Sequence, residues 1–177
     1  MAEQEFAPLT AMVEVAYHEL KFIAHRHLAA RGAGAHAGDA SLETTALVHE
    51  AYLKLAASAR VTWRDESHFR ATASVVMRQI LVDRARARAS QKHGGNAVFV
   101  SFDESALAVA DASETVLAID AALTRLARVA PRLAQIVEMR FFGGMSDAEV
   151  ASALGVNRRT VQRDWIKARA LLEAELR

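Results

Sequence analysis

The sequence contains no cysteine, 2 prolines and 8 glycines among its 177 residues. Without cysteine, the chain has no disulfide framework, no cysteine-ligated zinc and no thiol nucleophile. The scarcity of proline and glycine allows long helices, and much of the 52% hydrophobic content is alanine, a strong helix former. Alternating runs of β-branched residues are nearly absent, so strands are not supported. We therefore expect an all-α fold.

Long apolar runs are missing too. No stretch of about 18 apolar residues occurs, so the sequence predicts no membrane insertion. The first residues, Met-Ala-Glu-Gln-Glu-Phe, are acidic and lack the basic and apolar blocks of a signal peptide. We expect a cytoplasmic protein whose length suits one medium domain or two small helical ones.

The distribution of charge is more informative than its sum, because the formal net charge is only +1. Residues 78–92 and 157–169 each carry five cations and one anion, whereas residues 99–120 carry five acids and no Lys or Arg. Two basic segments on either side of an acidic one indicate two nucleic-acid surfaces joined by a connector.

The last third of the chain has the pattern of a helix-turn-helix. Ser146 followed by Glu149 is a capping box at the start of a short helix. Gly155 suits a turn that needs a positive φ, and Asn157 is a good N-cap for the next helix. That helix has an apolar stripe at Val161, Trp165, Ala168 and Leu172, and on its opposite face the cations Arg159, Arg163 and Lys167. A helix of this kind places side chains in a major groove, so duplex DNA is the expected partner. Asp164 stands where a hydrophobic residue is common.

Further helices are predicted from apolar spacing and breakers at about residues 8–30, 42–58, 67–91, 113–129 and 132–142. The seam of the third of these is formed by Phe69, Ala73, Val76 and Ile80. Residues 31–39 contain three glycines and are expected to form a loop. The acidic stretch around 97–111 is the expected domain boundary, which gives domains at 1–95 and 113–177 and a linker at 96–112.

A metal-dependent enzyme is the first alternative. The only cluster of His and acidic residues is Glu14, His18, Glu19, His25 and His27. Glu14 and His18 have the i, i+4 spacing of helical metal ligands, but the other histidines fall elsewhere on the helix. No glycine-rich phosphate loop, nucleophile elbow or paired-carboxylate signature occurs. We expect a solvated helix face, with no metal, no cofactor and no catalytic residue.

The two halves together resemble bacterial sigma factors of the sigma-70 family, of the extracytoplasmic-function (ECF) type. The resemblance covers about residues 40–177. In the first half it rests on 44–55 (TTALVHEAYLKL) and on 68–88, which ends in VMRQILVDRARAR. At the start of the linker it rests on 92–95 (KHGG) and 100–104 (VSFDE), and in the second half on 137–146 (VEMRFFGGMS) and the helix-turn-helix.

This resemblance implies two small helical domains, a sigma domain 2-like bundle and a sigma domain 4-like helix-turn-helix, joined by the acidic linker. It also implies two partners, core RNA polymerase and promoter DNA. Domain 2 would recognise and open the −10 element, domain 4 would read the −35 element, and the linker would thread near the active cleft of the polymerase. An anti-sigma factor is a further partner that the resemblance allows.

The resemblance also implies roles for individual residues. Polymerase binding falls to Leu47, Glu50, Tyr52 and Leu53, on or behind the docking surface. Contacts near the −10 element fall to Trp63, His68, Arg78, Arg84, Arg86 and Arg88. Contacts with the −35 duplex fall to Arg158, Arg159, Thr160, Gln162, Arg163 and Lys167. Two features depart from the family pattern: residues 41–45 hold one acid where many members have a cluster, and Arg70 follows Phe69 where an apolar residue is expected.

A helix-turn-helix transcriptional regulator that binds duplex DNA without being a polymerase subunit is the second alternative. Such a regulator with a receiver domain needs alternating strands and an acidic phosphorylation pocket. The first half of this chain is instead predicted to be helical and to end in a basic helix. Tight binding to duplex DNA in the absence of polymerase would favour the regulator.

Overall fold

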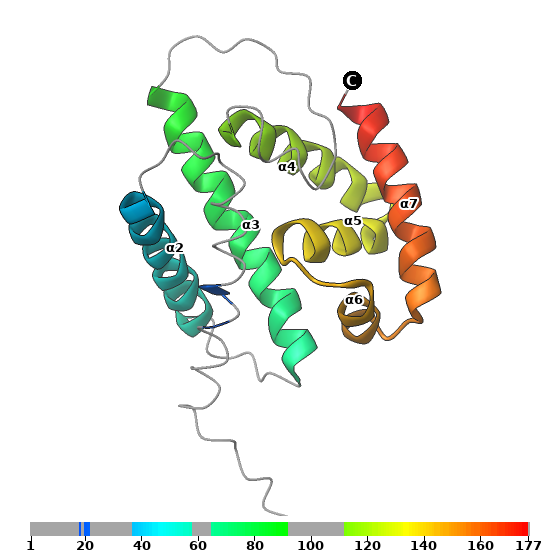
Figure 1. Cartoon of the computed structure of the whole chain (residues 1–177). Helices are drawn as coiled ribbons and strands as arrows, with labels where there is room; N and C mark the ends of the chain where they lie inside the picture. The colour runs from blue at the N-terminus through cyan, green and yellow to red at the C-terminus, as the bar shows by residue number, and fades with distance from the viewer. Residues whose placement is uncertain (1–17, 19, 22–36, 58–64, 92–111, 177) are drawn as a thin grey trace, which may run out of the picture.

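The computed structural model describes residues 18, 20–21, 37–57, 65–91 and 112–176 (Figure 1). Within these ranges it has six α-helices, one π-helical segment and no strand, which confirms the all-α prediction. The first-half helices are α2 (Ala37–Ala57) and α3 (Glu66–Gln91). The second-half helices are α4 (Ala112–Val129), α5 (Pro131–Val137), η2 (Glu138–Phe142), α6 (Asp147–Leu154) and α7 (Arg158–Glu175).

The helix expected at 8–30 lies outside the described residues except at positions 18, 20 and 21. The linker expected at 96–112 lies outside them except for Ala112, so the domain boundaries stay a prediction. The loop expected at residues 31–39 extends too far, because α2 already begins at Ala37 and residues 37–39 are helical. None of the helices in the described ranges has the length and hydropathy to cross a membrane.

Helices α2 and α3 are held together by an apolar core. The predicted seam of α3 is buried at all four positions, with exposed fractions between 0% and 8%. It packs in one cluster with Leu20, Leu47, Val48, Ala51, Leu55 and Met77. At the start of α3, the Asp65 carboxylate accepts a hydrogen bond of 2.8 Å from the backbone N–H of His68, which satisfies one of the free N–H groups of the first turn.

The opposite side of α3 packs against the second half of the chain. In Figure 1, α3 crosses the molecule between α2 on one side and the second-half helices on the other, where it contacts α4, η2 and α6. Val82 and Ala85 of α3 are buried in the same cluster as Ile119 and Leu123 of α4. Helix α3 therefore contributes side chains to two cores.

The helix expected at 132–142 is present but changes its winding part-way. It is α-helical to Val137 and then π-helical, with the backbone N–H of Gly143 bonded to the carbonyl of Glu138 at 3.2 Å. The wider turn is compatible with burial of the neighbouring Phe141 and Phe142, whose rings meet edge to face at 4.9 Å. These rings join the core under α4 and α7.

Two leucines on α2 test this account of the first core. Leu47 is 0% exposed and Leu53 is 53% exposed. We expect Leu47→Ala to lower the free energy of unfolding by about 2–5 kcal/mol, because it leaves a cavity between α2 and α3. Leu53→Ala, the matched control, should lower it by less than about 1 kcal/mol. Urea unfolding followed by circular dichroism measures both, and equal losses would show that the core is misplaced.

Candidate nucleic-acid interface

The first helix of the helix-turn-helix, α6, begins at the predicted capping box. The Ser146 hydroxyl accepts a hydrogen bond from the Glu149 N–H at 3.3 Å, and the Glu149 carboxylate accepts one from the Ser146 N–H at 2.7 Å. Burial by itself would raise the pKa of Glu149, but these hydrogen bonds and the charge of Arg70 outweigh it and hold the pKa below its usual value. The Glu149 carboxylate of the capping box is therefore charged at neutral pH.

The turn between α6 and α7 has the predicted chemistry. Gly155 has φ +64°, a conformation that costs little only for glycine, and a Cβ there would meet no atom within 4 Å. Asn157 then caps α7, since its side-chain oxygen accepts hydrogen bonds from the Thr160 N–H at 2.8 Å and the Thr160 hydroxyl at 3.0 Å. These local bonds fix the direction in which α7 leaves the turn.

Helix α7 buries one face and exposes the other. The buried face contains the predicted Val161, Ala168 and Leu172, with Trp165 half-buried between two cores. The guanidinium of Arg140 lies 4.3 Å from the centroid of the Trp165 ring, a cation–π contact that ties η2 to α7.

Asp164 is the polar member of this buried face. It is 1% exposed, and its carboxylate binds Arg132 of α5 at 2.7 Å and the neighbouring Arg163 at 3.3 Å. Burial would raise its pKa, but the hydrogen bonds and charges of the two arginines outweigh this and lower it. The aspartate that interrupts the apolar pattern therefore links α7 to α5 by charge.

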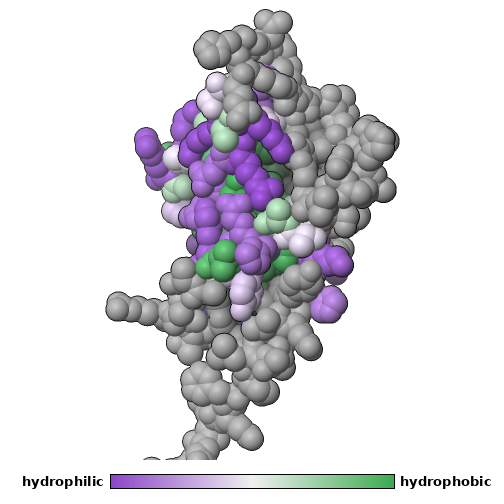
Figure 2. Space-filling model, turned by 90° about the vertical axis from the view of Figure 1, so that its left-hand side faces the viewer, coloured by the Kyte–Doolittle hydropathy of each residue, from purple (hydrophilic) through white to green (hydrophobic). Residues whose placement is uncertain are grey.

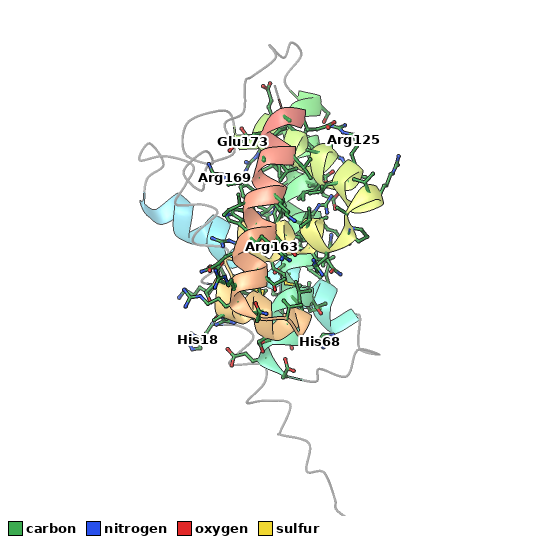
Figure 3. The ribbon with its side chains drawn as sticks, turned by 90° about the vertical axis from the view of Figure 1, so that its right-hand side faces the viewer. His18, His68, Arg125, Arg163, Arg169 and Glu173 are labelled. Atoms are coloured by element: carbon green, nitrogen blue, oxygen red, sulfur yellow. The ribbon has the colours of Figure 1, made fainter. Side chains whose placement is uncertain are left out.

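The exposed face of α7 carries the residues predicted to contact the −35 duplex. Of these, Thr160 is half-buried in the cap, and the other members are exposed: Arg158, Arg159, Gln162, Arg163 and Lys167. Helix α7 lies at the front of Figure 3, where Arg163 is labelled and no other described helix covers its outer face. The second-half helices thus hold α7 with its cationic face exposed to solvent. Helix-turn-helix proteins place their second helix in a major groove with this arrangement.

The arginines predicted to contact the −10 element lie along α3, and three of them are held in ion pairs with carboxylates of other helices. Arg84 is paired with Glu50 of α2 at 3.0 Å. Arg78 is paired across the two halves with Asp120 and Glu138, and Arg86 is bonded to Asp120 at 3.4 Å. Of the remaining predicted residues, Arg88 is half-buried near the end of α3, His68 is half-buried at its start, and Trp63 lies outside the described residues.

A family model described as ECF sigma factor matches residues 7–177. The chain belongs to the ECF sigma factor family. No curated protein and no solved structure matches it. The match extends over both basic segments, so the helix-turn-helix and α3 belong to one ECF sigma factor sequence.

The residues predicted to bind polymerase lie on α2 of this ECF sigma factor. Leu47 is fully buried and so lies behind the surface, whereas Leu53 is half exposed. Glu50 and Tyr52 are half-buried, and Glu50 holds Arg84. Figure 2 looks onto this side of the molecule, where the described side chains are mostly hydrophilic with small apolar patches.

Three residues of functional interest were not found from the sequence. Arg132, which sits at the start of α5 and binds Asp164, places one more cation beside α7. Asp120 and Glu138 are the partners of Arg78. The only signal in the sequence was Asp164 itself, an acid at an apolar position, which needs a cationic partner when it is buried.

The cluster of histidines and acids considered as a metal site falls mostly outside the described residues. His18 is described and exposed, whereas Glu14, Glu19, His25 and His27 are not described. In the described part of the chain, no group of three His, Cys, Asp or Glu residues is placed to hold a metal ion.

Asp164→Asn tests the buried ion pairs of α7. Because the folded-state pKa of Asp164 is below its unfolded value of about 3.9, its charge stabilises the fold above about pH 4, and this contribution is lost as the pH falls through the lower folded-state pKa. We expect the substitution to cost roughly 1–3 kcal/mol at pH 7 and progressively less below about pH 4. Thermal unfolding of both proteins between pH 7 and pH 3 measures this.

The control is Glu173→Gln on the same helix, because Glu173 forms an exposed pair with Arg169 at 3.2 Å. Exposed pairs contribute little, so this variant should stay close to the parent protein at every pH. A cost for Asp164→Asn that does not change with pH would contradict the ion-pair assignment.

Proposed function

We propose that this ECF sigma factor binds core RNA polymerase and directs it to promoters, with α7 reading the −35 element and α3 contributing to −10 recognition. It would act by binding alone, with no catalytic residue and no cofactor of its own. The observation that carries the proposal is the exposed cationic face of α7 on a helix-turn-helix whose caps, turn and core contacts are all formed.

The first turns of α7 carry exposed polar and cationic side chains suited to binding the −35 element. Arg158, Arg159 and Gln162 are exposed there, at the end of the helix that enters a major groove in proteins of this architecture. An arginine that binds guanine with two hydrogen bonds discriminates by about 1–3 kcal/mol, while cations on phosphates position without specifying. Arg132 lies beside this end of α7 through its bond to Asp164, where it would act as a phosphate contact.

Polymerase docking is proposed for the outer face of α2. Leu53 supplies exposed apolar area there, while Leu47 and Ala51 fix the helix from beneath. Truncating Leu53 would therefore affect docking without opening the core, and truncating Leu47 would affect the fold first.

Run-off transcription tests the proposed function as a whole. Core RNA polymerase is incubated with genomic promoter fragments, with and without this protein. We expect discrete new transcripts that depend on the protein, because a sigma factor supplies the promoter recognition that core polymerase lacks. Binding of the protein to duplex DNA with no transcripts and no co-elution with the polymerase would instead favour a regulator that is not a polymerase subunit.

Arg159→Ala tests the assignment of the −35 face. We expect it to reduce transcription from promoters with an intact −35 element by roughly 5- to 150-fold, the equivalent of about 1–3 kcal/mol. Promoters with a scrambled −35 element should respond much less. Co-elution with core polymerase should be unchanged.

The matched control is Arg169→Ala, which removes the same charge from the same helix. Arg169 lies ten residues further along α7 and is paired with Glu173 (Figure 3). Equal effects of the two substitutions would indicate general electrostatic attraction and would contradict a recognition surface at the start of α7.

A further inference from the structure

The contact between the two halves has a one-sided charge pattern. In the ion pairs of Arg70, Arg78 and Arg86 with the described second-half helices, the cations come from α3 and the carboxylates from the second half. We call this set the interface cluster: Arg70, Arg78 and Arg86 on one side, and Asp120, Glu138 and Glu149 on the other. Such polar, charge-complementary surfaces are typical of interfaces that form and separate.

Arg78 is the centre of the interface cluster, and all three of its side-chain nitrogens are used. Nε donates to the Asp120 carboxylate at 2.9 Å, and Nη1 donates to Glu138 at 3.1 Å. Nη2 donates to the Asp120 carbonyl at 3.2 Å and to the Thr124 hydroxyl at 3.0 Å. The side chain is 17% exposed. A DNA phosphate would need the same guanidinium, so it cannot bind Arg78 while Asp120 and Glu138 do.

A close fit of the Ser74 side chain against Gly143 supports the charge pattern. Ser74 of α3 is 0% exposed, and it faces Gly143 at the end of η2. A Cβ at Gly143 would overlap the Ser74 hydroxyl oxygen across the interface, so glycine at this position lets Ser74 lie this close to the end of η2. Shape and charge therefore specify the same arrangement of the two halves.

We infer that the free protein is held in a closed, autoinhibited form, in which Asp120 and Glu138 occupy the place of DNA phosphates at Arg78. The inference rests on the proposed function, since it assigns −10 contacts to α3. In the closed form α3 packs against α2 on one side and against α4, η2 and α6 on the other, and Arg78 is held on the second-half side. The interface cluster must therefore open before α3 engages the −10 element, while the outer face of α7 stays accessible throughout.

A surface cleft reaches the interface cluster and makes it sensitive to salt. The cleft is lined by Val75, Gln79 and Asp83 next to Arg78, so ions from solvent have access to the pairs. Rising ionic strength screens exposed pairs most, so the pair of the exposed Arg86 with Asp120 should weaken first as salt is raised.

The closed form can be locked with a disulfide, because the chain has no cysteine of its own. The hydroxyl oxygens of Ser67 on α3 and Ser152 on α6 are 3.2 Å apart across the interface. The double variant Ser67→Cys/Ser152→Cys should therefore form an intramolecular bridge under mild oxidation, detected by mass and by mobility on a non-reducing gel. The two single variants control for effects of the oxidant.

Transcription by core polymerase with the double variant then tests the inference. We expect the oxidised protein to be inactive on a promoter fragment identified by run-off transcription, with full recovery after reduction. An oxidised protein as active as the reduced one would overturn the inference, and so would failure of the bridge to form. Loss of transcription in the reduced protein and in the unmodified chain would instead be a failure of the proposed function.

Removing the acids supplies a second test that does not depend on the bridge. Asp120→Asn/Glu138→Gln should slow bridging of the cysteine pair and tighten binding of the free protein to a −10 single strand from the same promoter. If the open form is about a tenth of the free protein, the gain is up to about tenfold.

The matched control is Asp83→Asn. Asp83 lies on α3 and pairs with Arg86 at 3.7 Å and Lys54 at 3.4 Å, both in the first half. The substitution therefore removes a carboxylate from α3 without breaking a pair across the interface. Equal gains from the control and from the Asp120 and Glu138 substitutions would overturn the closed-form assignment, because they would reflect net charge alone.

Discussion

The packing of α3 on two different surfaces is the constraint on which the rest of this structure depends. One side of the helix is apolar and is buried against α2, and the other side carries small and charged residues that meet the second half. Val82 and Ala85 show how the two roles meet in one helix, because they belong to the second core although they lie only a few residues from Ile80 in the first.

Charge is used differently at the two ends of the molecule. At α7, a buried carboxylate links α7 to α5 and one of its cationic partners, Arg163, still points to solvent at 60% exposure of its side chain. At α3, carboxylates from another part of the chain occupy the cations themselves. Arg163 is therefore displayed on α7, whereas Arg78 is shielded on α3. This difference follows from where the acids lie, since both basic segments carry five cations and one anion.

The parts of the structure that could be predicted from sequence depend on short-range interactions. The capping box at Ser146, the turn at Gly155 and the cap at Asn157 each involve partners within a few residues, so the spacing alone contains the information. The partners of Arg78 lie 42 and 60 residues away, and no periodicity in a single sequence relates them. The π-helical turn was missed for a related reason: its winding accompanies the burial of Phe141 and Phe142 by other helices, whereas the local sequence predicts an ordinary helix.

One apparent defect in the pattern turned out to be informative. Asp164 interrupts the apolar stripe of α7, and the structure shows that it is buried because two arginines neutralise it. The sequence alone shows an acid at an apolar position. It does not identify the partner Arg132, which lies on another helix, 32 residues earlier in the chain.

The central claim is that one chain places α7 on the −35 duplex and α3 at the −10 element of a promoter bound to polymerase. A cryo-electron microscopy structure of core polymerase, this protein and a promoter fragment tests it most directly. The account predicts α7 in the major groove of the −35 region, α2 against the polymerase, and α3 separated from α4. A complex in which Arg78 remains bonded to Asp120 and Glu138, or in which the outer face of α7 is turned away from the DNA, would contradict it.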